Sequence, residues 1–311
     1  MSEALRVFEE LIGTLEEHKR YSVDMAKLAE RSVFHKDRAP KMRVCGTYVA
    51  LQPRSMEPAA TWHVVASNFC RVRLCPMCEW RKSLRLYSAL LRVVDALPDM
   101  NWLLCTLTTP NVKAEKLGET ITALYRESRL LLKRPELKSW IGWLRCTEVT
   151  YNSDADTYHP HLHILVAVRP TYWKSRGYIS TAKLRSLWPL GDQVDLRRVR
   201  DPRRGCCEVA KYATKPLIFP EDETLRAKYT WVYDTLCTEL HGRRLVQAGG
   251  CVKAALAALR IDLEADDTEG VEEADLPLLA LSWAFTAKSG AGAYVQTDGT
   301  RGSIDIFRKV K

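Results

Sequence analysis

The run His159–Val168, with the sequence HPHLHILVAV, limits what this chain can fold into more than any other stretch. Histidines stand at every second position, at 159, 161 and 163, with apolar residues between them. Side chains alternate between the two faces of a strand, so the three imidazoles are expected on one face and the apolar residues on the other. The apolar residues that follow predict a buried strand. Neutral imidazole is a common ligand of divalent metal ions, so this face is a candidate metal site.

A second strand-like segment precedes the histidines. Trp143–Tyr151 (WLRCTEVTY) is separated from them by the polar loop Asn152–Thr157, which is typical of a β-hairpin. Pairing that is symmetric about this loop places Glu148 opposite His161. His161, His163 and Glu148, with His159 as a further candidate, would suit Mg²⁺ or Mn²⁺ acting on phosphate. From spacing alone, the alternative that some of these histidines only pack or hydrogen-bond stays open.

Four cysteines predict a second metal site. Cys70, Cys75 and Cys78 follow Cys45 at a distance, and the last two form a CxxC pair. This spacing is typical of a structural tetrahedral Zn²⁺ site. The alternatives are a redox pair, or a merely buried Cys45 with His63 as a ligand in its place.

Basic residues surround the cysteines and favour DNA as a partner. A zinc-pinned module that projects them is a plausible DNA clamp, and a solvated basic face is the alternative. The candidate DNA contacts are Arg71, Arg73, Arg81 and Lys82.

Composition narrows the class of protein. The 311 residues carry a formal net charge of +9, which favours a polyanionic partner such as nucleic acid. No stretch of 18 or more apolar residues exists, so no membrane span is predicted. The N-terminus lacks the features of a signal peptide, and we expect a cytoplasmic protein with reduced cysteines.

Periodicity gives the expected order of elements. The expected helices are 2–20, about 23–34, 80–97, 114–133, 180–187, 208–215, 225–236 and 252–261. The expected strands are 102–108, 143–151, 159–168 and 193–199. Residues 201–205 read as a charged turn, and 264–275 as an acidic linker or exposed loop. Two further strands are expected about the turn at 297–299.

The segment Glu208–Lys215, with the sequence EVAKYATK, combines three kinds of chemistry on one helix face. Glu208, Tyr212 and Lys215 are spaced to share that face. A tyrosine oxygen can act as a nucleophile, a lysine can hold phosphate, and a glutamate can activate water. The alternative is an ion-paired amphipathic helix.

Four segments in order resemble those of plasmid rolling-circle replication initiators. They are CRVRLCPMCEWRKSL (70–84), LCTLTTPNV (104–112), TEVT with YHPHLHILV (147–166), and EVAKYATK (208–215). These initiators belong to the HUH endonucleases, named for two histidines around a bulky apolar residue, here His161-Leu162-His163. The resemblance extends from about residue 45 to 261.

The resemblance implies an α+β protein with the HUH replication-initiator fold, a central antiparallel β-sheet flanked by helices, and an N-terminal zinc-knuckle insertion. Four consecutive regions are expected. They are an N-terminal helical segment (1–44), a Cys-rich zinc- and DNA-binding region (45–100), the catalytic domain (101–261), and an acidic linker and tail of unknown role (262–311).

The resemblance also implies an activity. His161 and His163 would bind the catalytic ion, and Tyr212 would cut one strand at the plasmid's double-strand origin, leaving a 5′-phosphotyrosine. Glu208 would direct water for the terminating cleavage. From the chemistry of the helix itself, Lys215 is a third candidate catalytic residue and Lys211 a further candidate DNA contact. The expected partners are origin DNA, single-stranded or hairpin at the nick site, and the host helicase, DNA polymerase and single-strand-binding protein.

Three alternatives are weighed against this activity. A relaxase or single-strand transposase of the same superfamily fits the histidines, but the cysteines and EVAKYATK favour the initiator. A zinc-knuckle DNA-binding regulator would bind the origin and form no covalent adduct. A metal oxygenase is disfavoured by the charge of +9 and the Tyr–Glu–Lys helix.

Overall fold

A computed structural model describes residues 3–53, 62–191, 193–212, 220, 222–263, 279–286 and 291–296. The chain forms two compact units. Unit 1 consists of Met1–Trp80, Pro216–Asp234 and Ala265–Lys311, and unit 2 of Arg81–Lys215 and Thr235–Glu264. The division into four consecutive functional regions stays a prediction.

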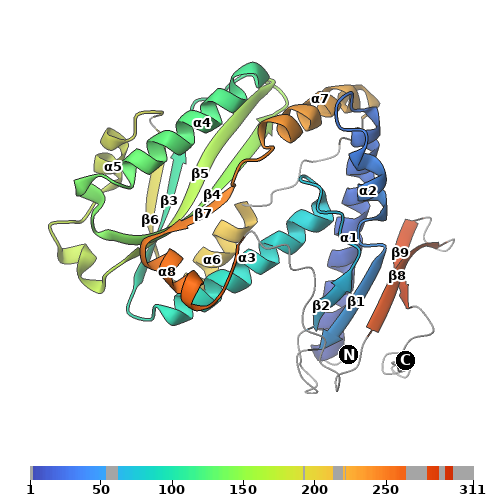
Figure 1. The fold of residues 1–311 in the computed structure, drawn as a ribbon, viewed down its shortest axis with the longest axis horizontal. Coiled ribbons are helices and arrows are strands. Elements are labelled where there is room, and N and C mark those ends of the chain that lie inside the picture. Colours follow the sequence, from blue (N-terminus) through green and yellow to red (C-terminus); the bar gives the residue numbers. More distant parts are fainter. Residues whose placement is uncertain are drawn as a thin grey trace. The chain divides into compact units, whose positions relative to one another are not determined.

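The described elements follow in chain order (Figure 1). The helices are α1 (Glu3–Arg31), α2 (Arg38–Val44), α3 (Pro76–Ala96), α4 (Ala114–Leu131), α5 (Thr181–Leu187), α6 (Pro202–Tyr212), α7 (Glu223–Glu239) and α8 (Gly250–Ala258), with short 3₁₀ turns η1 (Pro135–Leu137) and η2 (Pro170–Lys174). The strands are β1 (Tyr48–Pro53), β2 (Trp62–Ser67), β3 (Asn101–Thr108), β4 (Trp140–Asn152), β5 (Thr157–Val168), β6 (Val194–Val199), β7 (Val246–Gly249), β8 (Leu279–Thr286) and β9 (Ala291–Gln296).

Unit 2 is built on a five-stranded sheet in the order β6-β3-β5-β4-β7, with neighbouring strands antiparallel. Helices cover both faces, as Figure 1 shows. Leu162 and Ile164 pack on the face of α4 and α5, whereas Leu165 and Ala167 pack on the face of α3, α6 and α8. The expected α+β class with an antiparallel sheet is confirmed. The histidines share the parity of Leu165, so they lie on the α6 face.

The hairpin of β4 and β5 has the register that the sequence predicted. Glu148 is directly opposite His161, and pairing continues to Asn152 opposite Thr157. The Asn152 side-chain oxygen accepts from the backbone N–H of Asp154 and of Ala155, both at 3.0 Å, which closes the turn. Because a slip of one residue would move Glu148 to the other face, this turn decides whether the carboxylate meets the histidines.

Two expectations about helices are wrong. The two predicted N-terminal helices are one, α1, because no proline or glycine interrupts residues 20–23 and the Ser22 hydroxyl bonds to the His18 carbonyl within the helix at 3.0 Å. The charged turn expected at 201–205 is largely the first turn of α6. Asp201 accepts from the backbone N–H of Arg203 at 3.0 Å and Pro202 occupies the first helical position, which together start a helix.

Unit 1 contains a second sheet that the sequence did not predict, in the order β2-β1-β8-β9. Residues 48–51 of β1 pair with 279–282 of β8, a partnership across most of the chain that no local pattern reveals. The hairpin expected about residues 297–299 lies outside the described residues, whereas β9 pairs with β8.

No helix in the described ranges combines the length and the apolar character that a membrane crossing requires.

Candidate active site and metal centres

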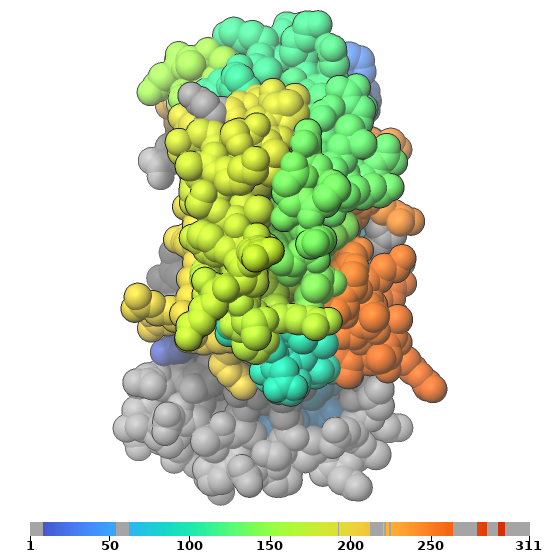
Figure 2. Space-filling view, turned by 90° about the vertical axis from the view of Figure 1, so that its left-hand side faces the viewer, coloured from blue at the N-terminus to red at the C-terminus, as the bar shows by residue number. Residues whose placement is uncertain are grey.

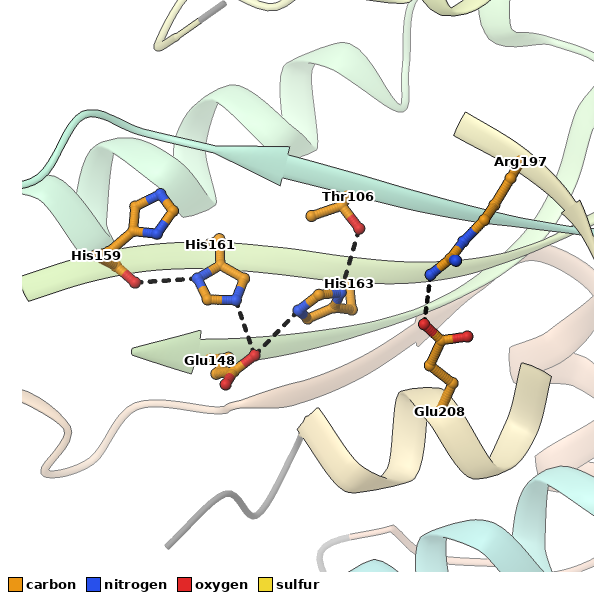
Figure 3. A network of polar contacts seen from close by, with 7 residues as sticks. All are labelled: Thr106, Glu148, His159, His161, His163, Arg197 and Glu208. Atoms are coloured by element: carbon orange, nitrogen blue, oxygen red, sulfur yellow. Dashed lines mark hydrogen bonds and ion pairs between the residues drawn. The ribbon is translucent and has the colours of Figure 1, made fainter. Parts of the chain in front are cut away.

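Glu148, His161 and His163 converge on the α6 face of the unit 2 sheet. The Glu148 Oε2 atom lies 2.8 Å from the His161 Nε2 and 3.1 Å from the His163 Nε2 (Figure 3). All three residues are buried, with exposed fractions of 5%, 8% and 5%. One potential ligand atom from each lies within 4.8 Å of the others. Two imidazoles and one carboxylate so arranged match the donor set of a divalent metal site.

The outer contacts of the histidines favour a cation at this point. The His161 Nδ1 lies 3.0 Å from the His159 carbonyl oxygen, which can only accept, so that nitrogen carries a proton. A neutral His161 then presents the lone pair of Nε2 to the Glu148 carboxylate. Two lone pairs 2.8 Å apart require a proton or a cation between them. These residues therefore fit a metal ion.

Burial favours the neutral form of His163, which is the form that binds a metal ion. Burial lowers its pKa below the ordinary value, and the Glu148 carboxylate opposes this shift. Its Nδ1 lies 3.3 Å from the Thr106 hydroxyl on β3, which orients the ring.

His159, the fourth predicted ligand, stands apart from this group. Its ring centre is 5.0 Å from that of His161, and its side chain is not one of the three that converge. In Figure 3 its imidazole lies beyond His161, on the side away from Glu148. Burial lowers its pKa as well.

Helix α6 brings the second predicted group to the same face. It contacts β5, β4 and β6, and Glu208 forms an ion pair with Arg197 of β6 (Figure 3). The end of α6 that follows Glu208 points toward Glu148 and His161 in this view. Tyr212 is the last residue of α6, one turn beyond Glu208. The Tyr212 side chain and Lys215 lie outside the described residues, and Lys211 is exposed.

An open cleft of about 660 Å³ lies beside this site. Thr106, Thr108 and Asp195 line it, together with Arg185 of α5. Thr106 is opposite His163 on one side and opposite Asp195 on the other, so the cleft borders the histidine face. It provides space for a substrate next to the candidate metal ligands.

The four predicted cysteines also meet, in unit 1. The Cys45 and Cys78 sulfurs are 3.5 Å apart, the Cys70 and Cys78 sulfurs 3.7 Å, and all four lie within 4.8 Å of one another. Four thiolates on one Zn²⁺ would be separated by about 3.8 Å, given a Zn–S bond of about 2.3 Å and tetrahedral geometry. The cluster therefore fits zinc. His63 lies on β2, opposite Gln52, and is not part of it.

Polar groups of α1 surround the thiols. The fully buried Lys19 ammonium donates to the Cys45 carbonyl at 2.8 Å, and the Ser22 hydroxyl lies 3.4 Å from the Cys75 sulfur. Hydrogen bonds from the neighbouring thiols, Cys45 first, hold the pKa of Cys75 well below its usual range. A buried cation and a favoured thiolate suit the net negative charge of a zinc–tetrathiolate group.

The predicted DNA contacts lie around this knuckle. Arg71 is exposed and adopts a left-handed conformation (φ 60°), as does Leu74 (φ 70°), within the loop between Cys70 and Cys75. Such conformations are unfavourable for these residue types, and both lie between two of the clustered cysteines. Arg81 and Lys82 continue along α3.

Sequence reasoning missed the supporting residues. Thr106, Arg197, Lys19 and Ser22 carry no local signal, because each acts on a residue far away in the chain. Thr106 lies within the quoted motif LCTLTTPNV, which was the one available indication.

Comparison with known proteins assigns the chain to a protein family. A family model described as "Replication protein" matches residues 62–288. The chain belongs to this family of replication proteins. The resemblance to plasmid replication initiators is thereby confirmed.

Several relatives support the assignment. A "Protein rep" of Bacillus amyloliquefaciens is 32% identical over 238 residues, covering 67% of this chain and 70% of the relative. One of Streptococcus pneumoniae is 28% identical over 260 residues, 78% of each chain. One of a Bacillus species is 36% identical over 175 residues, and the match spans about half the length of that relative (56%). No solved structure gives a significant match.

Proposed function

We propose that this replication protein is a metal-dependent nickase that initiates rolling-circle replication of a plasmid and has the HUH fold. The convergence of Glu148, His161 and His163 on the face that α6 crosses carries the proposal. The order of motifs and the membership of the family support it. The protein would act in the cytoplasm on origin DNA, presented as a single strand or hairpin.

The three converging residues would hold Mg²⁺ or Mn²⁺. When bound, the ion would polarise the scissile phosphodiester and stabilise its developing negative charge. Thr106 and the His159 carbonyl would fix the two rings, so that the ligand nitrogens need no reorganisation during the reaction. The cleft bounded by Thr108 and Asp195 would admit the strand.

Tyr212 would supply the nucleophile. Its phenolic oxygen, losing its proton, would attack the phosphorus, a P–O bond to the tyrosine would form, and the bond to the 3′ oxygen would break. The products are a 5′-phosphotyrosine and a free 3′-hydroxyl that a host polymerase extends. Lys215, three residues further along, would contact the phosphate.

Glu208 would serve the terminating step. It would accept a proton from the water that attacks the phosphodiester of the regenerated origin in the terminating cleavage, and the ion pair with Arg197 would hold its carboxylate in position. A terminal hydrolysis would limit each molecule to one round.

The cysteine knuckle would bind structural Zn²⁺ and present the basic residues around it to duplex DNA. Its fit rests on the sulfur separations and on the buried Lys19. Arg71, Arg73, Arg81, Lys82 and Lys211 would contact phosphates.

The test uses the full chain, Mn²⁺ and an origin-bearing single strand carrying a label on the 3′ side of the nick. The wild type should acquire the label covalently. Tyr212→Phe should lose the adduct and retain DNA binding, whereas Tyr178→Phe, a control at an exposed tyrosine, should behave as the wild type. An adduct that persists in Tyr212→Phe would refute the proposed nucleophile. Binding without any adduct in the wild type would indicate a DNA-binding regulator instead.

Glu208→Ala separates the two steps. It should form the adduct at the wild-type rate and release it slowly. Loss of the first cleavage in this variant would contradict the role proposed for Glu208.

A further inference from the structure

Unit 2 has a second open cleft, of about 730 Å³, on the sheet face opposite the histidines. Trp143 and Arg145 of β4 line it, and both have the opposite parity to Glu148. Helix α4 forms one wall, and residues of β7 and the start of α8 form the other. In Figure 2, the green segment of α4 and the residues after it lies beside the orange β7 and α8.

A buried cation, the guanidinium of Arg145, lies in this cleft. The Arg145 side chain belongs to a residue only 3% exposed. It donates to the Ser128 hydroxyl at 2.9 Å and to the Gln247 side-chain oxygen, and its guanidinium lies 4.4 Å from the centre of the Tyr125 ring. Among the described residues, no carboxylate pairs with Arg145, and its Nε–H has no hydrogen-bond partner. Since a buried charge is costly unless it is compensated, this arrangement favours an anionic ligand.

More cations border the same cleft. The wall on the α4 side carries three basic residues, Arg126, Arg129 and Lys133. Arg126 is engaged by Glu127 at 2.8 Å, but Arg129 and Lys133 are exposed and form no ion pair within the described part of the chain. The cleft therefore joins a row of positive charge to two partly buried aromatic rings, Tyr125 and Trp143.

We propose that this cleft is a second DNA-contact site, which holds a single-stranded segment outside the nick site. Phosphodiesters would lie on Arg129 and Lys133, with Arg145 supplying positive charge from the floor and an unstacked base against Trp143. A basic groove with aromatic side chains is the arrangement by which proteins hold single strands without reading their sequence. This inference rests on the proposed function in one respect: the anionic ligand of the cleft is taken to be DNA. The sheet separates the cleft from the histidines, so binding here leaves the cleavage site accessible.

The experiment measures the affinity of the full chain for a long single strand over a range of salt concentrations. Arg129→Ala/Lys133→Ala is compared with the control Lys116→Ala/Lys138→Ala, which removes the same charge from exposed positions outside the cleft. The cleft variant should bind roughly tenfold more weakly, and its salt dependence should fall by about 1.4 in the slope of log K against log salt, because two contacts to a single strand are lost. Equal affinities and slopes for the two variants would overturn the proposal.

A second variant tests the buried guanidinium. Arg145→Met should unfold near the wild-type temperature, since the loss of its two hydrogen bonds is offset by the loss of the desolvation penalty of a buried charge, while its single-strand affinity falls about tenfold. Lower stability with unchanged affinity would show a purely structural Arg145 and overturn its part in binding. An equal loss for duplex and single-stranded probes would overturn the contact with an unstacked base.

A short oligonucleotide that contains only the nick site keeps this proposal separate from the nickase. Both cleft variants should form the covalent adduct on it as the wild type does. If the wild type forms no adduct on this oligonucleotide, the proposed nickase activity is refuted. The measured affinities for single-stranded DNA then still test the cleft.

Discussion

The substitution Glu148→Gln tests the candidate metal centre most directly. The amide has almost the same shape as the carboxylate but carries no charge, and Glu148 is the one acidic member of the converging group. The residue is 5% exposed, so water gives little compensation for the lost charge. We expect the variant to fold and to lose its metal affinity.

The structure sets the size of two expected losses, one in metal affinity and one in the free energy of unfolding. Loss of a residue that supports a metal ligand typically weakens binding about 10- to 100-fold, so loss of a charged ligand itself should cost at least about 100-fold, or about 2.7 kcal/mol. Without metal, the carboxylate accepts from two buried imidazoles, at 2.8 and 3.1 Å. Each such bond to a charged group contributes about 1.5–3 kcal/mol against about 1 kcal/mol for a neutral acceptor, so the fold should lose about 1–4 kcal/mol.

The assay is a Mn²⁺ titration of zinc-loaded full-length protein by calorimetry, followed by nicking of the origin strand. His159→Gln is the matched control: because its ring does not converge with the others, its Mn²⁺ affinity should stay within about threefold of the wild type. Glu148→Gln binding within about threefold of the wild type would refute a metal at this position. Strong loss in His159→Gln would add that residue to the ligands.

Three further predictions concern the cysteine cluster, the core and pH. Cys78→Ser should lower the zinc content by mass spectrometry and the unfolding temperature, whereas Cys251→Ser, outside the cluster, should keep the zinc; equal zinc in both would contradict the site. Leu162→Ala, fully buried, should cost about 2–5 kcal/mol in denaturant unfolding, against less than about 0.5 kcal/mol for Leu130→Ala, which is 50% exposed. Burial lowers the pKa of His18 below 6.5, so the unfolded state binds the proton first as pH falls. The free energy of unfolding should therefore decline below about pH 6.5, and this decline should be smaller in His18→Asn. Thermal unfolding measured over a range of pH tests this. Identical pH profiles for the wild type and the variant would exclude His18 as a cause.

Local sequence patterns predicted much of the candidate site. The alternation of His161 and His163 fixed a common face, and the symmetric loop set Glu148 opposite His161, as the register confirms. The CxxC pair and its distant partners likewise met as predicted. These inferences succeed because strand periodicity and hairpin register depend on neighbouring residues.

Other features escaped because their partners are remote. The pairing of β1 with β8 joins the beginning of the chain to its end, and neither strand shows a pattern that names the other. The contacts of Lys19 with the cysteine segment, and of Arg197 with Glu208, arise only when separate elements pack. Periodicity also failed at residues 201–205, where charge suggested a turn but Asp201 and Pro202 begin a helix.

By itself, the sequence determined which residue types are candidate metal ligands, the face that the histidines share and the membership of the replication protein family. The tertiary structure decided that α6 crosses that face and that His159 stands apart from the converging group. It also decided that Arg145 lies buried on the opposite face, with no acidic partner among the described residues. Local patterns fix side-chain direction along one strand, whereas the meeting of side chains from distant segments depends on how the sheet and helices pack.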